Sequence, residues 1–547
     1  MQNKKPTRLS SQRVLLAIIA LLFLFTAAVT FSRAMLRELN HDENYFIASG
    51  KLLADQGLLP YRDFPYSHLP NLVFVYALIF KITDRLLLGA RIFSVICANL
   101  MLLSLFGLIY RLFGQEQNRL PQPARLLLAA CGVLFLAANP LFAYTSGLAW
   151  SHDLPVLLLM LAFLACTHGV EQNHPRRWIF ASGFLAALAV GARLTFVFAL
   201  IPFYISFAWA PINTESRQSA SGFRRWWALA LPFSAGVVIG MLPAIILFAI
   251  APDKFFFWNM SFIQVNTLYQ QVSGVNERMD LFSKLIYIFG KLNAQPGNLL
   301  LLVSAFFFGY TLLLLAYRRE KKIDFASSLL LLVVVCLTIG GLIPSPSFDQ
   351  YFYAPVPFAV AAIFYGLASL RRITPSESLP PLTRRFNLAH QENWFILLLV
   401  QIVLLANLFS LGDYAKIGKL AQPSAWIPLQ VHSIGTWIKD MDLEAGKVLT
   451  LTPIYPLEGG LQIYPQLATG PFVWRAAYLI PGEELEQYGG VSRKNINSFL
   501  SQDPPTAILV RREGDQFAED DLPLVKYAQQ NHYTQKEITR YLWLWLP

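Results

Sequence analysis

The sequence predicts an α-helical protein that crosses a membrane many times and ends in a small α/β domain. Of its 547 residues, 55% are apolar and only 14% are charged, against roughly 25% charged in an average soluble protein. The apolar residues gather in runs of about 18 to 25, the length that an α-helix needs to cross roughly 30 Å of hydrocarbon. After Asp413 such runs disappear and short apolar stretches alternate with polar ones. This pattern excludes disorder and most soluble folds.

The net charge of +11 does not indicate a nucleic-acid partner. Lysine and arginine occur in short clusters between the apolar runs, whereas a nucleic-acid interface needs a continuous basic face. Such clusters are typical of the cytoplasmic loops of membrane proteins. The four cysteines, Cys97, Cys131, Cys166 and Cys336, lie inside apolar runs. Because they lack the spacing of metal ligands, we expect neither disulfides nor a zinc site.

The N-terminal segment predicts the orientation of the chain. Residues 1–13 hold four basic residues and no acidic one, and an apolar run over residues 14–31 follows directly. This charge keeps the N-terminus in the cytoplasm. A cleaved signal peptide is the alternative, but the run is long for one and no clear pair of small residues marks a cleavage site. We therefore expect a retained first span.

The loop after the first span, residues 32–70, is rich in charged and histidine residues, and we expect it to lie outside the cytoplasm. These residues are His41, Asp42, Glu43, Lys51, Asp55, Arg62, Asp63 and His68. If residues 45–56 form a short amphipathic helix, Asp42 and Glu43 stand near its N-terminus, where the helix dipole favours negative charge. The pair then has two interpretations, helix capping or catalysis.

Ten further apolar runs bring the expected number of spans to eleven. They lie near residues 71–88, 90–110, 126–148, 154–169, 178–207, 228–250, 298–317, 326–344, 352–370 and 394–412. An odd number places the C-terminal domain outside and leaves basic clusters near residues 217–225, 318–322 and 371–372 in the cytoplasm. Two other clusters, residues 111–125 and 176–177, fall outside in this assignment. Since the run 178–207 contains Arg193 and can break into two helices, the expected range is eleven to thirteen.

The composition of residues 413–547 predicts a separate domain. They contain 12 basic and 15 acidic residues, whereas the preceding chain is strongly basic. Residues 447–452 and 506–510 read as strands, and residues 521–531 as a polar helix. We expect a small α/β domain outside the cytoplasm, following a transmembrane domain of residues 1–412.

Short motifs in their order along the chain resemble a known family. They are Asp42-Glu43 with Tyr45, residues 57–64 and 68–70, Arg91, and residues 151–155, 191–193 and 350–355. Together they resemble the GT-C glycosyltransferases, in the bacterial branch similar to dolichyl-phosphate-mannose-protein mannosyltransferases and aminoarabinose transferases. The resemblance covers about residues 1–412. It implies a GT-C-like fold in the bacterial inner membrane.

The resemblance also implies an activity, the inverting transfer of a hexose or pentose from a polyprenyl phosphate to an extracytoplasmic acceptor. The acceptor is a glycan, a lipid or a protein. Because the departing phosphate is a good leaving group, the enzyme needs a base for the incoming nucleophile but no acid for the departing oxygen. No metal-ligand cluster is expected, and the participation of a divalent metal is left open.

The site residues follow from the same resemblance. Asp42 is expected as the general base, with Glu43 as a second catalytic carboxylate. The residues expected at the donor phosphate are His68, Arg91, Arg193 and Tyr351, and those expected at the substrate are Asp63 and Asp153. Two positions depart from the family pattern: Ser67-His68 stands where the aminoarabinose branch has Glu-Lys before proline, and Arg193 stands where many relatives have lysine.

Structural alternatives remain for most of these residues. Asp63 fits a turn, and Arg91 fits a side chain that snorkels to the interface. His68 fits solvent exposure or packing, and Tyr351 fits interfacial anchoring. Asp153 falls at the cytoplasmic edge in the eleven-span assignment, whereas the resemblance places it at the outer edge.

Two other kinds of protein share some of these features. A transporter or lipid flippase also needs many spans, but the two halves of this chain show no similarity. A membrane scaffold or receptor would use the C-terminal domain to bind a partner and would not need the Asp42 loop. No glycine-rich phosphate loop or nucleotide-binding fingerprint is present, which disfavours a nucleotide-sugar donor.

Overall fold

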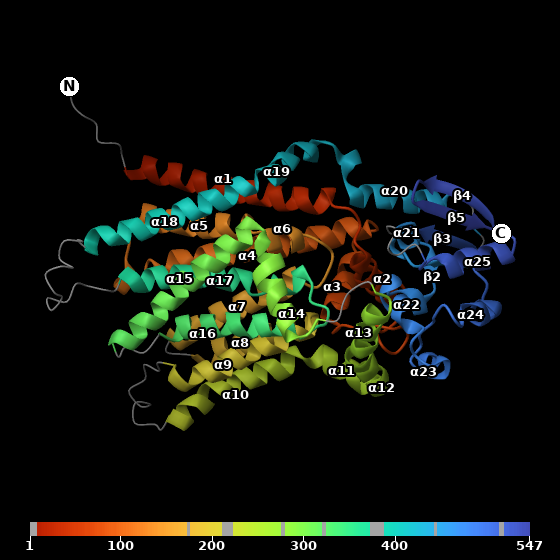
Figure 1. The fold of residues 1–547 in the computed structure, drawn as a ribbon, viewed down its shortest axis with the longest axis horizontal. Helices are drawn as coiled ribbons and strands as arrows, with labels where there is room; N and C mark the ends of the chain where they lie inside the picture. The colour runs from red at the N-terminus through yellow and green to blue at the C-terminus, as the bar shows by residue number, and fades with distance from the viewer. Residues whose placement is uncertain are drawn as a thin grey trace.

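The computed structural model describes residues 8–171, 175–210, 222–274, 279–319, 324–371, 388–441, 443, 446–512 and 519–547. Long helices run side by side in a bundle, and the C-terminal elements lie beyond one end of it (Figure 1). Helix α2 (His41–Gln56) lies at this same end. We call it the α2 end of the bundle, and the other the opposite end.

Helices long and apolar enough to cross a membrane confirm the expected fold class. Among the described residues five pass this test: Arg13–Leu36 within α1 (Arg8–Leu36), α4 (Leu86–Leu112), α7 (Asp153–Glu171), α16 (Phe325–Leu342), and Asp349–Ser369, which includes most of α17 (Val356–Arg371). Two bent pairs raise the number to seven if each is one span: Phe223–Gly240 within α10 (Gly222–Gly240) with α11 (Leu242–Ile250), and Trp394–Phe409 within α18 (Leu388–Phe409) with Leu411–Ala421.

Shorter apolar helices account for the difference from the predicted eleven. In the described part of the chain they are α3 (Asn71–Phe80), α5 (Gln122–Ala137), Leu194–Trp209 and Pro296–Tyr310. The last lies within α15 (Pro296–Arg319). By length alone these helices do not qualify as complete spans, so the eleven-span count does not follow from helix length and composition.

The predicted span at residues 71–88 is not a single long helix. Its helical part, α3, has ten residues, which at 1.5 Å per residue is about 15 Å and only half of the hydrocarbon thickness. It lies beside α2 at the α2 end (Figure 1). The next helix, α4, begins at that end, because its Arg91 pairs with Glu43 of α2.

The basic residues that the eleven-span assignment put outside lie at the opposite end. Arg111, in the last turn of α4, pairs with Glu171 at the end of α7. Arg125 stacks on Tyr110 near the end of α4, with its guanidinium carbon 3.9 Å from the ring centroid. These arginines therefore lie far along α4 from the α2 end. The predicted basic residues Arg217, Lys321, Lys322 and Arg372 lie outside the described residues.

The run 178–207 breaks at Arg193, as its sequence allowed. Helix α8 (Pro175–Ala192) ends there, and a 3₁₀ segment (Leu194–Ala199) with α9 (Leu200–Ser206) follows. Arg193 itself is extended, with φ −153° and ψ 115°. Near the break, Asn71 of α3 donates to the Leu188 carbonyl at 3.1 Å. The break consequently places Arg193 at the α2 end.

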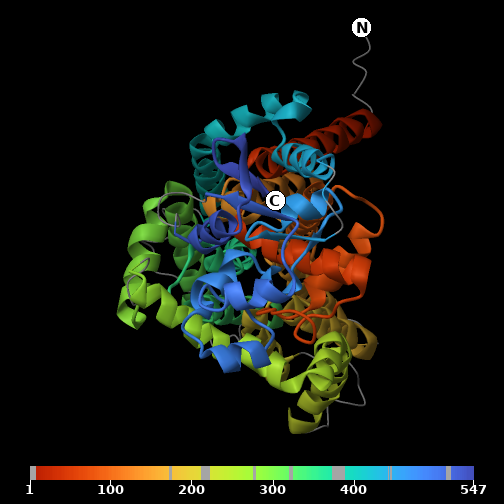
Figure 2. The same cartoon turned by 90° about the vertical axis from the view of Figure 1, so that its right-hand side faces the viewer.

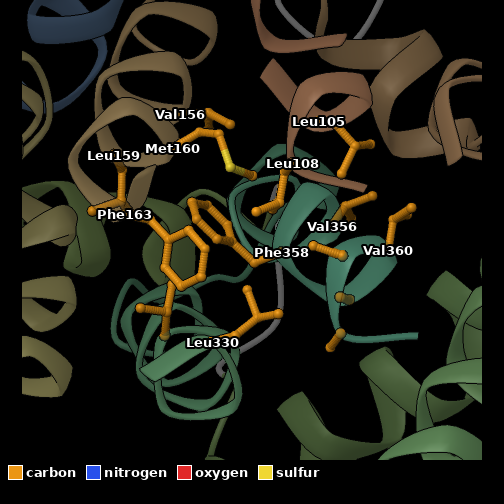
Figure 3. Close-up of a cluster of buried hydrophobic side chains, with 14 of the residues drawn as sticks. Leu105, Leu108, Val156, Leu159, Met160, Phe163, Leu330, Val356, Phe358 and Val360 are labelled. Atoms are coloured by element: carbon orange, nitrogen blue, oxygen red, sulfur yellow. The ribbon is translucent and has the colours of Figure 1, made fainter. Parts of the chain in front are cut away.

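A buried apolar cluster holds the central helices together. Figure 3 shows side chains of α4, α7, α16 and α17 converging, including Leu108, Met160, Phe163, Leu330 and Phe358. In a membrane such contacts act by close packing, because lipid tails are as apolar as the side chains. The cluster fixes α4 and α7 side by side, and with them the residues that begin each helix.

Short helices lie between these segments: α6 (Pro140–Thr145), α12 (Pro252–Phe256), α13 (Phe262–Val272) and α14 (Leu281–Ile286). Two further short elements, α19 (Leu411–Tyr414) and a 3₁₀ turn at Asp349–Phe352, belong to candidate spans named above. Figure 1 shows α12 and α13 near the α2 end, next to the C-terminal elements.

The C-terminal elements form the predicted small α/β fold. A mixed five-stranded sheet has the order β2-β1-β3-β5-β4, in which β1 pairs parallel with β2 and β3, and β5 pairs antiparallel with β3 and β4. The strands are β1 (Lys447–Thr450), β2 (Gln462–Ile463), β3 (Ala507–Arg511), β4 (Thr534–Thr539) and β5 (Leu542–Leu546). The helices are α20 (Ile427–Lys439), α21 (Ile454–Glu458), α22 (Pro471–Ala477), α23 (Gly482–Gln487), α24 (Ile496–Gln502) and α25 (Leu522–Gln530). Figure 2 shows these blue elements lying across the end of the bundle.

Candidate active site

Helix α2 begins with a capping box that fixes the Asp42-Glu43 pair in its first turn. The Asn40 side chain accepts a hydrogen bond from the Asp42 amide at 2.9 Å, and the Glu43 carboxylate accepts one from the Asn40 amide at 3.0 Å. Each partner satisfies an amide that the helix itself cannot pair. The helix thus begins at His41, earlier than the residues 45–56 considered from the sequence.

Glu43 and Arg91 form a fully buried ion pair. Arg91 donates to both Glu43 oxygens, at 2.8 and 2.6 Å, and both side chains have no exposed surface. The other N–H groups of Arg91 donate to the carbonyls of Ala34 at 2.6 Å, Arg37 at 2.8 Å and Glu38 at 3.2 Å. A guanidinium has five N–H groups, and these five contacts use them all.

This pairing gives Arg91 and Glu43 a different part from the one expected. Arg91 has no donor left for a phosphate, and Glu43 has no exposed oxygen for an acceptor. Instead they join the end of α1, the start of α2 and the second turn of α4. The same resemblance that predicts Asp42 as a site residue also predicts these two. Their contacts instead indicate that they stabilise the loop over residues 32–70.

Asp42 differs from its neighbour because its side chain is 30% exposed. Its one ion-pair partner among the described residues is the neighbouring His41, at 3.3 Å. It interacts electrostatically with Arg193, Tyr351 and Tyr144. The structure therefore holds a partly exposed carboxylate at the α2 end, within electrostatic range of a cation and two phenols.

Arg193 is brought to this site by the break after α8. Its guanidinium lies 3.0 Å from His152 Nε2 and 3.3 Å from Ser151 Oγ, and over the Tyr351 ring at 5.2 Å from the centroid. Because an arginine only donates, His152 Nε2 is the acceptor and is unprotonated. Burial, and then the charge of Arg193, lower the pKa of His152 well below its ordinary value. The predicted residues Arg193 and Tyr351 are thus together, with Asp42 in electrostatic reach.

His68 lies in an aromatic group that includes the C-terminal domain. Its ring stacks on Phe46 at 5.2 Å, meets Tyr45 edge-on at 5.3 Å, and lies 6.4 Å from Phe472 of α22. Burial, and then the charge of Arg193, lower the pKa of His68 to about 3. The ring is therefore neutral at physiological pH and offers one N–H without a charge.

Asp153 is buried rather than presented to a substrate. It accepts from the Gly147 amide at 2.7 Å and from the Tyr353 hydroxyl at 3.3 Å, and only 1% of the residue is exposed. In the same loop the Ala149 amide donates to Glu43 at 2.9 Å. Asp153 thus anchors the loop that carries His152, and this loop lies at the α2 end. Its expected position at the outer edge of the membrane stays a prediction.

Asp63 closes its own turn. Its carboxylate accepts from the Leu59 amide at 2.7 Å and pairs with Arg62 at 2.7 Å. The turn also contains Tyr61 with φ +66°. This geometry favours the turn interpretation over a part in substrate binding.

Several residues at the site have no signal in the sequence. Tyr144 is 39% exposed, and the guanidinium carbon of Arg37 lies 5.4 Å from its ring centroid. Asp349 accepts from the Tyr287 hydroxyl and interacts with Tyr144. Phe472 comes from a domain expected to be separate. Within the described ranges, no group of three His, Cys, Asp or Glu residues has an arrangement that could hold a metal ion.

A family model and several solved structures of membrane proteins are similar to this chain. Residues 67–243 match the family model of dolichyl-phosphate-mannose-protein mannosyltransferases. The chain is similar to ArnT from Cupriavidus metallidurans bound to undecaprenyl phosphate, with a TM-score of 0.58 and 13% identity over 97% of this chain and 98% of that one. The apo form of ArnT gives a TM-score of 0.57 and 12% identity over 99% and 98%. No curated protein matches the sequence. The expected resemblance is confirmed for the fold and, over residues 67–243, for the family model.

Proposed function

We propose that this GT-C-fold protein is an integral membrane glycosyltransferase that transfers a sugar from a polyprenyl phosphate to an acceptor outside the cytoplasm, with inversion. The observation that carries the proposal is the partly exposed Asp42, which the buried Glu43–Arg91 pair holds in place and which lies within electrostatic range of Arg193. The family match, which includes His68, Arg91 and Arg193, and the likeness to a protein that binds undecaprenyl phosphate support it.

In the proposed reaction Asp42 acts as the general base. The acceptor oxygen or nitrogen attacks the anomeric carbon while the bond from that carbon to the phosphate oxygen breaks. The proton of the acceptor passes to the Asp42 carboxylate, and the lipid phosphate leaves with the bonding electrons. A single displacement attacks from the face opposite the leaving group, so the anomeric configuration inverts.

Arg193 is the proposed partner of the donor phosphate. Its hydrogen bonds to Ser151 and His152 both use Nη1, which leaves the N–H groups of Nε and Nη2 for phosphate oxygens. A cation fixed there before the reaction stabilises the negative charge that develops on the leaving phosphate. His68 adds a neutral N–H donor, and Tyr351 supports the guanidinium through its ring face.

The distribution of charge supports an orientation with the α2 end outside the cytoplasm. Arg111 and Arg125 lie at the opposite end, where the positive-inside rule places them in the cytoplasm with the N-terminus. The site and the C-terminal domain then face the periplasmic side of a bacterial inner membrane. A glycan, lipid or protein acceptor would approach from that side.

The experiment is transfer from a radiolabelled polyprenyl-phosphate sugar in liposomes. We expect Asp42→Asn to lower kcat by about 100-fold or more, the usual contribution of a general base, because the amide keeps the shape but removes basicity. Asp55→Asn is the matched control, since Asp55 is a 49% exposed carboxylate on the same helix. Normal turnover by the Asp42→Asn protein would contradict the role of Asp42 as the general base.

A further inference from the structure

A short helix of the C-terminal domain, α21, joins α2 to α4 at the base of the site. At its start, the Ile454 amide donates to the Asn44 side-chain oxygen of α2 at 3.3 Å. At its end, the Glu458 carboxylate accepts from the Leu87 amide of α4 at 2.8 Å. Asn44 and Glu458 are both buried. The two ends of one five-residue helix thus contact the two helices that hold the catalytic loop.

The contact at Leu87 caps the start of α4. The first amides of a helix have no partner within it, and the residue before α4, Arg85, provides no side-chain cap. The carboxylate of Glu458, 371 residues away in sequence, takes this place. Its negative charge is also favourable at a helix N-terminus.

His432 of α20 completes the setting of Glu458. Its Nδ1 lies 2.8 Å from the other Glu458 oxygen, and the Glu458 side chain has no exposed surface. Both carboxylate oxygens are therefore engaged, one by α4 and one by α20. This arrangement fixes the carboxylate in direction as well as in position.

The contacts close into a ring around the first turn of α2. Leu87 and Arg91 lie one turn apart on α4, and Arg91 pairs with Glu43. Glu43 and Asn44 are consecutive on α2, and Asn44 returns to α21. Asp42 directly precedes these two residues. The ring therefore restrains the rotation and the position of the turn that presents Asp42.

We propose that Glu458 is a positioning residue for Asp42, so that the C-terminal domain is a working part of the active site. This inference rests on the proposed function, in which Asp42 is the base. Without the Glu458 carboxylate the Leu87 amide loses its partner, α4 loses its cap, and the Arg91–Glu43 pair is free to shift. Glu458 itself touches neither substrate nor the reacting atoms.

The first test compares Glu458→Ala with Glu458→Gln in the full-length protein in liposomes. The amide oxygen of glutamine can still accept from Leu87, so Gln is expected to recover at least half of kcat, while Ala lowers kcat about tenfold or more. The KM for the polyprenyl-phosphate donor is expected to stay within twofold, since Arg193 is untouched. Glu537→Ala, an exposed carboxylate on β4, is the matched control and should keep full activity. Equal kcat of Glu458→Ala and Glu537→Ala, or a change in KM alone, overturns the proposal.

The second test does not depend on activity. Hydrogen exchange of the amides in residues 41–50 and 86–90 should be faster in Glu458→Ala than in Glu537→Ala, and close to wild type in Glu458→Gln. If wild type transfers no sugar, the proposed function fails while this measurement still decides the coupling. Unchanged exchange in α2 overturns the positioning role, whatever happens to kcat.

Discussion

Two adjacent carboxylates in the first turn of α2 have opposite surroundings. Glu43 is buried and bonded on both oxygens, whereas Asp42 is 30% exposed. A buried bidentate pair with arginine is costly to break, because removing one partner leaves the other charge uncompensated. The Glu43–Arg91 pair is therefore suited to holding the turn in place, and the exposed Asp42 is suited to accept a proton. The sequence motif identifies this turn as part of the site, and the structure shows that its two carboxylates have different surroundings.

Arg193 provides a residue-scale test of donor binding. Arg193→Ala should raise the KM for the polyprenyl-phosphate donor about 100-fold, because it removes the guanidinium that lies with Tyr351 and His152. Arg193→Lys should raise KM about tenfold, since lysine keeps the charge but loses the planar fork of donors. Donor titrations at saturating acceptor measure both. Arg62→Ala, which removes a 47% exposed arginine of the loop over residues 32–70, is the control, and an equal KM in all three variants would contradict the role.

The lowered pKa of His68 predicts how the stability of the folded protein changes as the pH falls. Its pKa is about 3 in the folded protein, lowered by burial and by Arg193, against roughly 6.5 in an unfolded chain. Between these values the unfolded chain binds a proton that the folded chain excludes, so stability falls as pH drops below about 6.5. His68→Gln should therefore lose less Tm between pH 7 and pH 4.5 than wild type, as measured by thermal unfolding in detergent. His532→Asn, at an exposed site, should follow wild type; a His68→Gln curve identical to wild type would refute the shift.

At the scale of elements, the sequence predicted the strong features and missed the short ones. The long apolar runs, the break at Arg193 and the strands near residues 447 and 506 are all present. The sequence predicts a span at residues 71–88 because they are apolar almost throughout, and hydropathy does not show where a helix ends. Helix α3 ends near Phe80, and the turn over residues 81–85 reverses the direction assigned to α4.

That one element explains several site residues at once. With α3 as a short helix at the α2 end, α4 and α7 both start there. Arg91 and the segment that Asp153 anchors then both contact Glu43 of the loop 32–70. The contacts of Glu458 and Phe472 could not be predicted, because they join residues hundreds of positions apart and neither residue belongs to a motif. Capping by a distant carboxylate leaves no local pattern in sequence.

At the scale of the whole molecule, the arrangement predicts which end faces the cytoplasm. Exposed Glu116 lies in the connection between α4 and α5, at the opposite end, and exposed Glu537 lies on β4. A membrane-impermeant maleimide should label Glu537→Cys in intact spheroplasts and Glu116→Cys only after permeabilisation. Labelling of both, or the reverse order, would contradict the orientation and with it an outer active site.

The most direct test of the central claim is the single-turnover rate of sugar transfer by Asp42→Asn with the polyprenyl-phosphate donor already bound. This measurement isolates the chemical step from donor binding and product release. The account predicts that the rate falls about 100-fold or more while donor binding and the rate of Asp55→Asn remain as in wild type. A single-turnover rate equal to that of wild type would show that another group takes the proton.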